Sequence, residues 1–321
     1  MRKSRFVALS AAVALSIAAV GPVAADEIEP MDPGAAAGTT LLLDMKGPGN
    51  ANPFWAAVEH GATDAGAAYG ITVLVQAPTV ESDVPSQINQ IEDAIVAGVA
   101  GIALAPTDPA ALAPAVQQAL DEGIAVVFVD TKGDNEGVTF IGTDNEAGAA
   151  IAGGFLCDNV EAGGKVAILQ GIITQSTGQA RADGGAAAVT ACGLDLVAEI
   201  PANWDTAEGQ SATDDILVAN PDLAGIFASN DNMALGAVEA IAAAGIAPGG
   251  IVLIGFGANP SAAQAVLDGT MDATVAQSPY NMGWLGIESL VKLINGESLE
   301  AIVDTGTELV TIDNASEYVG S

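Results

Sequence analysis

Several aromatic and polar side chains stand where a predicted strand ends. Residues 40–45 form an apolar run typical of a buried strand, and Asn52-Pro53-Phe54-Trp55 follows it after a short loop, with Pro53 suited to the first turn of a helix. Phe54 and Trp55 are two of 13 aromatic residues (7 Phe, 3 Trp and 3 Tyr). Open α/β sheets bind ligands at the carboxyl ends of their strands, so these rings are candidates for a binding site. The alternative is that both rings belong to the core of the helix.

The other polar or aromatic residues that stand out occupy similar places. Each ends a predicted strand, follows one, or opens the next helix: Asp130, Arg181, Trp204, Asn230 and Gln277. Arg181 is the only arginine after residue 25, which indicates a role that lysine cannot fill, although a chance surface charge is the alternative. Rings that stack on apolar faces, together with amide, carboxylate and guanidinium groups, suit a ligand rich in hydroxyl groups.

Catalytic equipment is poorly represented. His60 is the single histidine and falls in the first predicted helix. The chain has no His/Cys cluster with metal spacing, no GxSxG elbow and no glycine-rich phosphate loop. We therefore expect a binding protein with no enzymatic step, no cofactor and no metal.

The first 25 residues have the layout of a secretory signal peptide, with Val23-Ala24-Ala25 as the cleavage site. No cysteine lies near that site to carry a lipid, so we expect an unanchored protein in the periplasm. Without residues 1–25 the chain keeps five basic residues against 40 acidic ones, a net charge of 5 − 40 = −35. Such a charge repels nucleic acid and anionic membrane surfaces.

The only two cysteines, Cys157 and Cys192, are a disulfide candidate because the chain is expected to be exported. Two free buried thiols are the alternative.

After residues 26–38, which we expect to be a flexible lead-in, short β-branched runs alternate with Ala-rich helical stretches. This alternation is typical of βαβ units on parallel sheets. The predicted strands are 40–45, 71–75, 101–105, 124–129, 165–169, 194–199, 223–228, 251–255, 272–276 and 307–312. The predicted helices are 53–69, 83–98, 109–122, 144–158, 178–191, 207–219, 231–244, 260–267 and 280–296.

The two halves of this series resemble each other. Segments 98–104 and 221–227 both pass from the end of a helix into an apolar strand, and polar residues then cap the next helix. We therefore expect an α/β fold of two Rossmann-like lobes, each a parallel sheet flanked by helices, with a ligand between them.

A series of short motifs, in order and at their spacing, carries a family resemblance. The motifs are Asn52-Pro53-Phe54-Trp55, Leu104-Ala105-Pro106-Thr107-Asp108, Val129-Asp130-Thr131, Gly142-Thr143-Asp144-Asn145, Leu169-Gln170-Gly171, Ala228-Ser229-Asn230-Asp231, Ile254-Gly255-Phe256 and Ala273-Thr274-Val275-Ala276-Gln277. The chain resembles the type 1 periplasmic solute-binding proteins of the ribose- and galactose-binding group, which serve ABC sugar transporters. The likeness covers essentially all of the chain after the signal peptide.

The resemblance implies a role for each candidate residue. Sugar hydroxyls would be bound by Asn52 and Asp130 of the first lobe and by Arg181, Asn230 and Gln277 of the second, while the sugar ring would lie between Phe54, Trp55 and Trp204. Lys46 sits where some relatives place a lysine against the ligand; a solvated surface lysine is the alternative.

Two positions depart from the family's ribose binders. Thr131 stands where they have an arginine, and Gly257 stands where they have an aspartate. We therefore expect a ligand that is not bound as ribose is, such as another pentose, a small polyol or a furanosyl signal molecule.

The resemblance also implies closure of the lobes about a hinge at 143, 277 and 309. The N-terminal lobe would comprise 39–143 and 278–309, and the C-terminal lobe 144–277 and 310–321. The closed form, expected as a monomer, would deliver its sugar or polyol ligand to a membrane permease, with a chemoreceptor as a further candidate partner. A receptor for a furanosyl signal or a chemotaxis ligand is the alternative function, and an exported carbohydrate-active enzyme is a weaker one.

Overall fold

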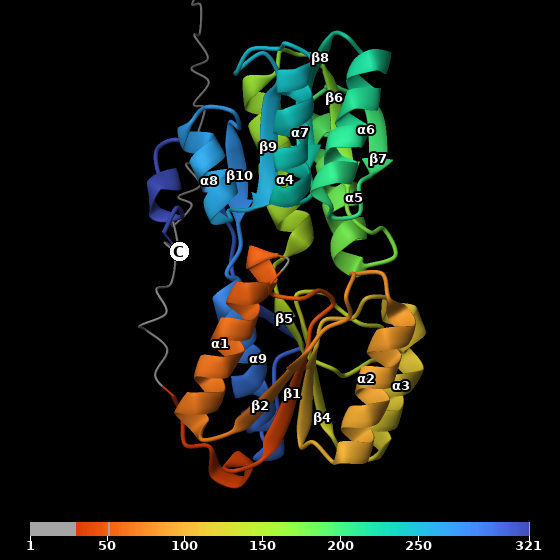
Figure 1. The fold of residues 1–321 in the computed structure, drawn as a ribbon, viewed down its shortest axis with the longest axis vertical. Helices are drawn as coiled ribbons and strands as arrows, with labels where there is room; N and C mark the ends of the chain where they lie inside the picture. The colour runs from red at the N-terminus through yellow and green to blue at the C-terminus, as the bar shows by residue number, and fades with distance from the viewer. Residues whose placement is uncertain (1–29, 51, 321) are drawn as a thin grey trace, which may run out of the picture.

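The structure is a computed structural model that describes residues 30–50 and 52–320. The predicted signal peptide, 1–25, lies outside the described residues. Two α/β lobes stand one above the other in Figure 1, each built on one sheet.

The first lobe is a parallel sheet of six strands in the order β11-β5-β4-β3-β1-β2. Its strands are β1 (Thr40–Asp44), β2 (Thr72–Gln76), β3 (Gly101–Leu104), β4 (Ala125–Val129), β5 (Phe140–Gly142) and β11 (Ile302–Asp304). One face is covered by α1 (Pro53–Tyr69) and α9 (Pro279–Ile294), and the other by α2 (Val84–Ala97) and α3 (Pro109–Asp121). Each face therefore has its own apolar core.

The second lobe repeats this plan with the order β12-β10-β9-β8-β6-β7. Its strands are β6 (Lys165–Gln170), β7 (Asp195–Pro201), β8 (Leu223–Ala228), β9 (Val252–Gly257), β10 (Ala273–Ala276) and β12 (Glu308–Val310), the last antiparallel to β10. Its helices are α4 (Asn145–Asn159), α5 (Ser176–Ala191), α6 (Thr206–Ala219), α7 (Asp231–Ala243) and α8 (Pro260–Leu267). The expected architecture of two sheets flanked by helices is confirmed.

The chain crosses between the lobes three times among the described residues. It does so after β5, after β10 and between β11 and β12. The third crossing lies at 305–307 rather than at 309, because residues 308–310 already pair with β10. The strands β5 and β11 have three residues each, too few to show an apolar periodicity, and the sequence did not predict them.

The prediction that residues 26–38 form a flexible lead-in is wrong for residues 33–38. Gly34–Ala36 form a short 3-10 helix (η2) whose Ala36 is buried. The side chain of Asn295, just after α9, accepts a hydrogen bond from the backbone N–H of Ala35 at 2.8 Å and donates to the carbonyl of Pro33 at 3.2 Å. The segment is thereby fixed to the base of the first lobe; residues 26–29 lie outside the described part of the chain.

A disulfide joins Cys157 in α4 to Cys192 after α5, which confirms the expected pair. These two helices pack side by side over one face of the second sheet. The bond therefore fixes neighbours that already share the core.

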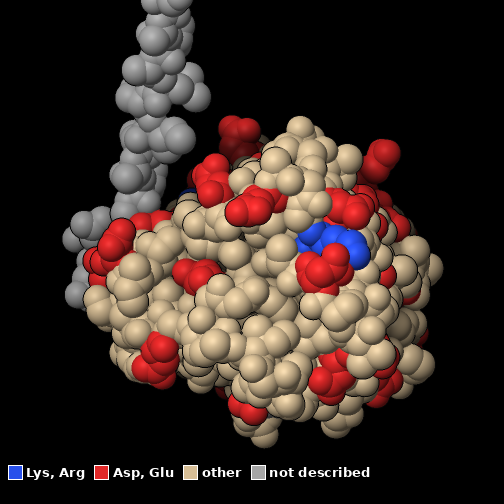
Figure 2. Space-filling view, turned by 90° about the horizontal axis from the view of Figure 1, so that it is seen from above, with Lys and Arg blue, Asp and Glu red and all other residues tan. Residues whose placement is uncertain are grey.

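Figure 2 views the molecule from the second-lobe end. Carboxylates are spread over this face, and basic side chains are confined to one small patch. Elsewhere, two of the five basic residues after position 25, Lys46 and Arg181, are buried, each about 4% exposed. An acidic surface thus contrasts with an interior that holds cations.

Candidate functional site

A cavity of about 560 Å³ lies between the two lobes. The carboxyl ends of parallel strands in both sheets meet there, the position where open α/β sheets bind ligands. The side chains predicted to bind a ligand all line it: Lys46, Asn52, Phe54, Trp55, Asp130, Arg181, Trp204, Asn230 and Gln277.

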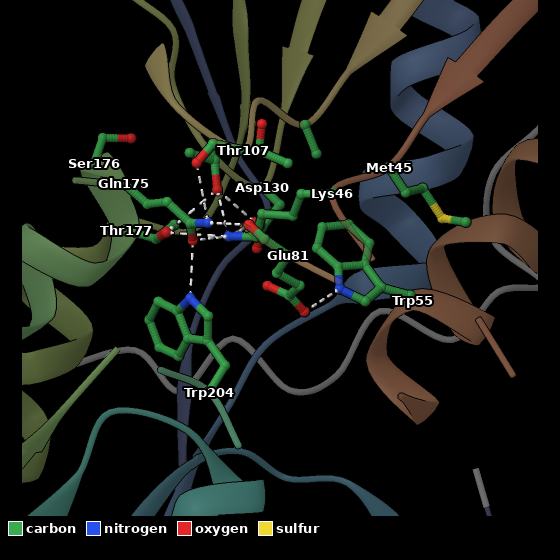
Figure 3. Close-up of polar contacts among 12 residues, drawn as sticks. Met45, Lys46, Trp55, Glu81, Thr107, Asp130, Gln175, Ser176, Thr177 and Trp204 are labelled. Atoms are coloured by element: carbon green, nitrogen blue, oxygen red, sulfur yellow. Dashed lines mark hydrogen bonds and ion pairs between the residues drawn. The ribbon is translucent and has the colours of Figure 1, made fainter. Parts of the chain in front are cut away.

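Two tryptophans supply aromatic walls from opposite lobes. Trp55, in the first turn of α1, is 1% exposed and donates its indole N–H to Glu81 Oε1 at 2.8 Å. Trp204, after β7, is 7% exposed and donates its indole N–H to Gln175 Oε1, also at 2.8 Å (Figure 3). Since both polar atoms are satisfied within the protein, only the apolar ring surfaces remain for a ligand.

A neighbouring ring and a glycine shape the two aromatic walls. Phe54 packs edge-on against Trp55, with ring centroids 5.0 Å apart. Gly171, directly after β6, lies under the Trp204 ring, and a Cβ atom at this position would overlap the indole. The Gly171 motif of the sequence is therefore a requirement of the second wall.

Arg181, in α5, is buried and has donors to spare. Its Nε, Nη1 and Nη2 donate to Asn145 Oδ1 at 2.8 Å, Ser229 O at 2.9 Å and Gln277 Oε1 at 2.8 Å. A guanidinium has five N–H groups, so two remain without a partner among the described residues. Burial lowers the pKa of Arg181 to about 10, against an opposing effect of nearby carboxylates, so the group is a cation at neutral pH.

The guanidinium also lies over aromatic rings. Its Cζ is 3.8 Å from the ring centroid of Phe256 in β9 and 5.6 Å from that of Trp204. These contacts fix the plane of the fork, which a lysine could not reproduce. Phe256 belongs to the Ile254-Gly255-Phe256 motif of the sequence, and its ring supports the arginine.

Lys46 faces the cavity rather than solvent. Its ammonium lies 3.0 Å from Asp130 Oδ2 and donates to Thr131 Oγ1 at 2.8 Å, Gln175 Oε1 at 2.9 Å and Thr177 Oγ1 at 3.3 Å. An ammonium has three N–H donors, so these four oxygens use all of them. The expected bond from Lys46 to a ligand therefore competes with partners that the protein already supplies.

Carboxylates in the cavity combine bound and open oxygens. Asp130 directs Oδ2 to Lys46 and Thr131, while Oδ1 has no partner among the described residues. Glu81, in the loop after β2, holds Trp55 with Oε1, and burial raises the pKa of its carboxyl. Glu81 is not predicted from the sequence, because a loop acid in so acidic a chain carries no distinguishing signal.

Asp231 lies beside Gly257, one of the two positions that depart from the ribose binders. Its carboxylate accepts bonds from Thr274 Oγ1 at 2.6 Å and from the N–H of Asn259 at 2.8 Å, and burial raises its pKa to about 6 despite these bonds and Arg181. A Cβ at Gly257 would lie 2.9 Å from Asp231 Oδ2, at a φ of +139°. An aspartate at 257 would therefore require the Asp231 carboxylate to shift.

The amides of the cavity each keep part of their hydrogen-bonding capacity. Asn52 and Asn230 cap α1 and α7 with their oxygens, and Asn230 also donates to the carbonyl of Trp204 at 3.2 Å. Gln277 accepts bonds from Arg181 and Thr143, so its NH₂ group is free toward the cavity among the described residues. Together with Arg181 and Asp130 they offer both donors and acceptors to one ligand.

The described residues hold no group of three or more His, Cys, Asp and Glu side chains that could bind a metal ion. Among these same residues, none of the helices has the length and apolar character needed to cross a bilayer.

The chain is similar to known periplasmic binding proteins. The family model described as a periplasmic binding protein domain matches residues 46–298. The D-ribose/D-allose-binding protein of Pseudomonas aeruginosa is 36% identical over 242 residues, which cover 72% of this chain and 76% of that protein.

Two solved structures share the architecture. An ABC transporter solute-binding protein from Actinobacillus succinogenes with bound D-allose has a TM-score of 0.82 and 30% identity, covering 87% of this chain and 100% of that one. One from Agrobacterium vitis with bound D-fucose has a TM-score of 0.81 and 34% identity, covering 86% and 96%.

Proposed function

The chain belongs to the periplasmic binding protein family, and on that premise we propose that it is the substrate-binding component of an ABC importer for a monosaccharide or small polyol. Relatives that bind D-ribose, D-allose or D-fucose support the substrate class.

The observation that carries the proposal is the set of unused groups in the cavity. The rings of Trp55 and Trp204 have no free polar atoms. The other groups that line the cavity are two guanidinium N–H donors of Arg181, amide NH₂ groups and one carboxylate oxygen of Asp130. A sugar has apolar C–H faces and a ring of hydroxyls that each donate and accept, so it matches both halves of this set.

Each candidate residue takes a role in this proposal. Asn52, Asp130, Arg181, Asn230 and Gln277 bond hydroxyls, and Trp55 and Trp204 stack on the ring, with Phe54 supporting Trp55. The absence of an aspartate at 257 leaves fewer acceptors on the second lobe, which favours a ligand that does not need them. We therefore expect the bound ligand to differ from ribose.

Delivery follows from closure. Ligand contacts from both lobes stabilise the closed form over the open form, because only the closed form makes both sets. The lobes move about the crossings near 143, 277 and 305–307. The closed, monomeric protein then presents surfaces of both lobes to a membrane permease in the periplasm, and a chemoreceptor is a second candidate partner.

No catalysed step is part of this proposal. The transport relatives support a carrier, and Asp130, Glu81 and Asp231 each have at least one carboxylate oxygen bound by protein groups. Incubation with a library of glycosides, with products followed by mass spectrometry, is expected to yield no turnover.

A thermal-shift screen tests the function. The panel contains pentoses, hexoses, tetritols, pentitols, furanosyl signals, amino acids and nucleosides, and calorimetry follows each hit. A ligand at 100 times its Kd adds about 2.7 kcal/mol to the free energy of unfolding. Stabilisation by an amino acid or nucleoside, with none by any sugar or polyol, would refute the substrate class.

A further inference from the structure

Gln175 is a buried amide at one edge of the cleft that no sequence motif singled out. It precedes α5 in the second lobe, and its side chain is 0% exposed. It does not line the cavity, in contrast to Thr177 two residues further on. Figure 3 places it between side chains of both lobes.

The amide of Gln175 uses its full hydrogen-bonding capacity. Its Nε2 donates to the carbonyl of Glu81 at 3.1 Å and to that of Thr107 at 3.2 Å, both in the first lobe. Its Oε1 accepts from Lys46 Nζ at 2.9 Å and from Trp204 Nε1 at 2.8 Å. Carbonyls at one end and donors at the other fix the orientation of the amide.

Three of these four bonds cross between the lobes. The lysine takes part in the same junction, because its ammonium also reaches Thr177 of the second lobe. The neighbouring Ser176 adds a hydrogen bond from its hydroxyl to the carbonyl of Lys132 at 2.9 Å. One edge of the cleft is therefore closed by protein groups alone.

The same amide connects the two aromatic walls. It holds Trp204 directly through the indole N–H. It reaches Trp55 through one residue, since Glu81 accepts from Gln175 with its backbone carbonyl and from Trp55 with its side chain. The ammonium of Lys46 lies between the walls, 5.7 Å from the Trp55 ring centroid and 5.4 Å from that of Trp204.

We infer that Gln175 is a positioning residue that latches one edge of the cleft and sets the separation of the tryptophan walls, and that Lys46 serves this latch rather than a ligand hydroxyl. The inference rests on the proposed function in so far as a ligand lies between those walls. Part of the closure free energy then comes from contacts between the lobes that the protein itself supplies. Loss of Gln175 should weaken ligand binding although the side chain is outside the cavity.

Gln175→Glu is the sharpest perturbation. It keeps the shape of the side chain but removes both N–H donors and turns a carboxylate toward two carbonyl oxygens. Gln175→Met removes the polar atoms without adding charge. Gln179→Met is the matched control, because Gln179 lies on the exposed side of the same helix and its side chain bonds only Asp183 among the described residues.

Small-angle scattering without ligand gives the deciding measurement. Both Gln175 variants, and Lys46→Met, are expected to have a larger radius of gyration than the unaltered protein, while Gln179→Met matches it. Folding is checked by the indole N–H resonances: those of Trp55 and Trp204 should shift in the Gln175 variants, whereas that of Trp284, which packs against Tyr69 and Tyr280, should remain. Folded Gln175 variants with an unchanged radius would overturn the latch.

Calorimetry with D-allose supplies the second readout. The Gln175 variants are expected to bind it about 10- to 100-fold more weakly, and Gln179→Met as tightly as the unaltered protein. Failure of every sugar to bind the unaltered protein would count against the proposed function and leave the scattering comparison valid. Equal affinity in folded Gln175 variants would overturn the positioning role.

Discussion

Arg181→Lys tests the centre of the proposed site. Arginine uses three N–H groups on Asn145, Ser229 and Gln277 and keeps two for a ligand. Lysine has one nitrogen on a flexible stem, so it cannot reach three separated acceptors and also a ligand. Hydrogen bonds from a charged group contribute about 1.5–3 kcal/mol each, so loss of two ligand bonds costs at least about 3 kcal/mol, or roughly 100-fold in Kd.

The same substitution should destabilise the protein without ligand. Two of the three buried acceptors lose their donor, at about 1–3 kcal/mol each. Calorimetry measures Kd and urea unfolding measures the free energy of unfolding, so the two effects are separated. Lys292→Ala is the control for binding, because Lys292 pairs with Glu288 on the same helix and does not line the cavity. A folded Arg181→Lys protein that binds within threefold of the unaltered one would remove Arg181 from the site.

Three further predictions concern stability. Gly257→Asp should lower the free energy of unfolding by more than about 2 kcal/mol in urea titrations, since its backbone has φ +139° and the new side chain meets Asp231; Gly154→Ala, where a Cβ meets nothing within 4 Å, should have little effect. The folded-state pKa of Asp231 is about 6 against 3.8 unfolded, so the folded state binds more protons between these values and stability falls as pH rises through them, by up to about 3 kcal/mol. Unfolding titrations across that window should show the decline, and a slope unchanged in Asp231→Asn would exclude this carboxyl as its source. Reduction of Cys157–Cys192, which spans 35 residues, should cost about 3–4 kcal/mol; an equal melting temperature with and without reductant would contradict this.

Many of the residues that line the cavity could be predicted from the sequence, because they obey one local rule. Asn52, Asp130, Asn230 and Gln277 each follow a strand, and parallel strands bring their carboxyl ends to one edge. Strand recognition therefore sufficed to group them. The same reasoning placed the helices and the longer strands, since their apolar periodicity is strong.

The site residues that could not be predicted from the sequence depend on contacts between segments far apart in the chain. Gln175 matters because its side chain donates hydrogen bonds to carbonyls 94 and 68 residues away, and its sequence neighbours do not indicate these contacts. Glu81 is one of 40 acidic residues, and only the folded chain shows that it accepts a hydrogen bond from Trp55. For Lys46, composition could not separate a buried cation from a solvated one, because that difference lies in four oxygens supplied by two distant segments.

Backbone strain in the described chain is concentrated at the cavity. Four non-glycine residues have positive φ: Asp130 at 60°, Asn203 at 50°, Trp204 at 67° and Ala258 at 52°. All except Asn203 line the cavity, and Asn203 adjoins Trp204. Such conformations cost of order 1–3 kcal/mol each and persist only where surrounding contacts hold them. Asp130 is held by Lys46 and Thr131, and Trp204 by Gln175 and Asn230. Lys46 restrains Asp130 within the first lobe and Gln175 restrains Trp204 within the second. The hydrogen bond from Lys46 to Gln175 links these two restraints across the lobe boundary, so closure and the geometry of the binding walls are coupled.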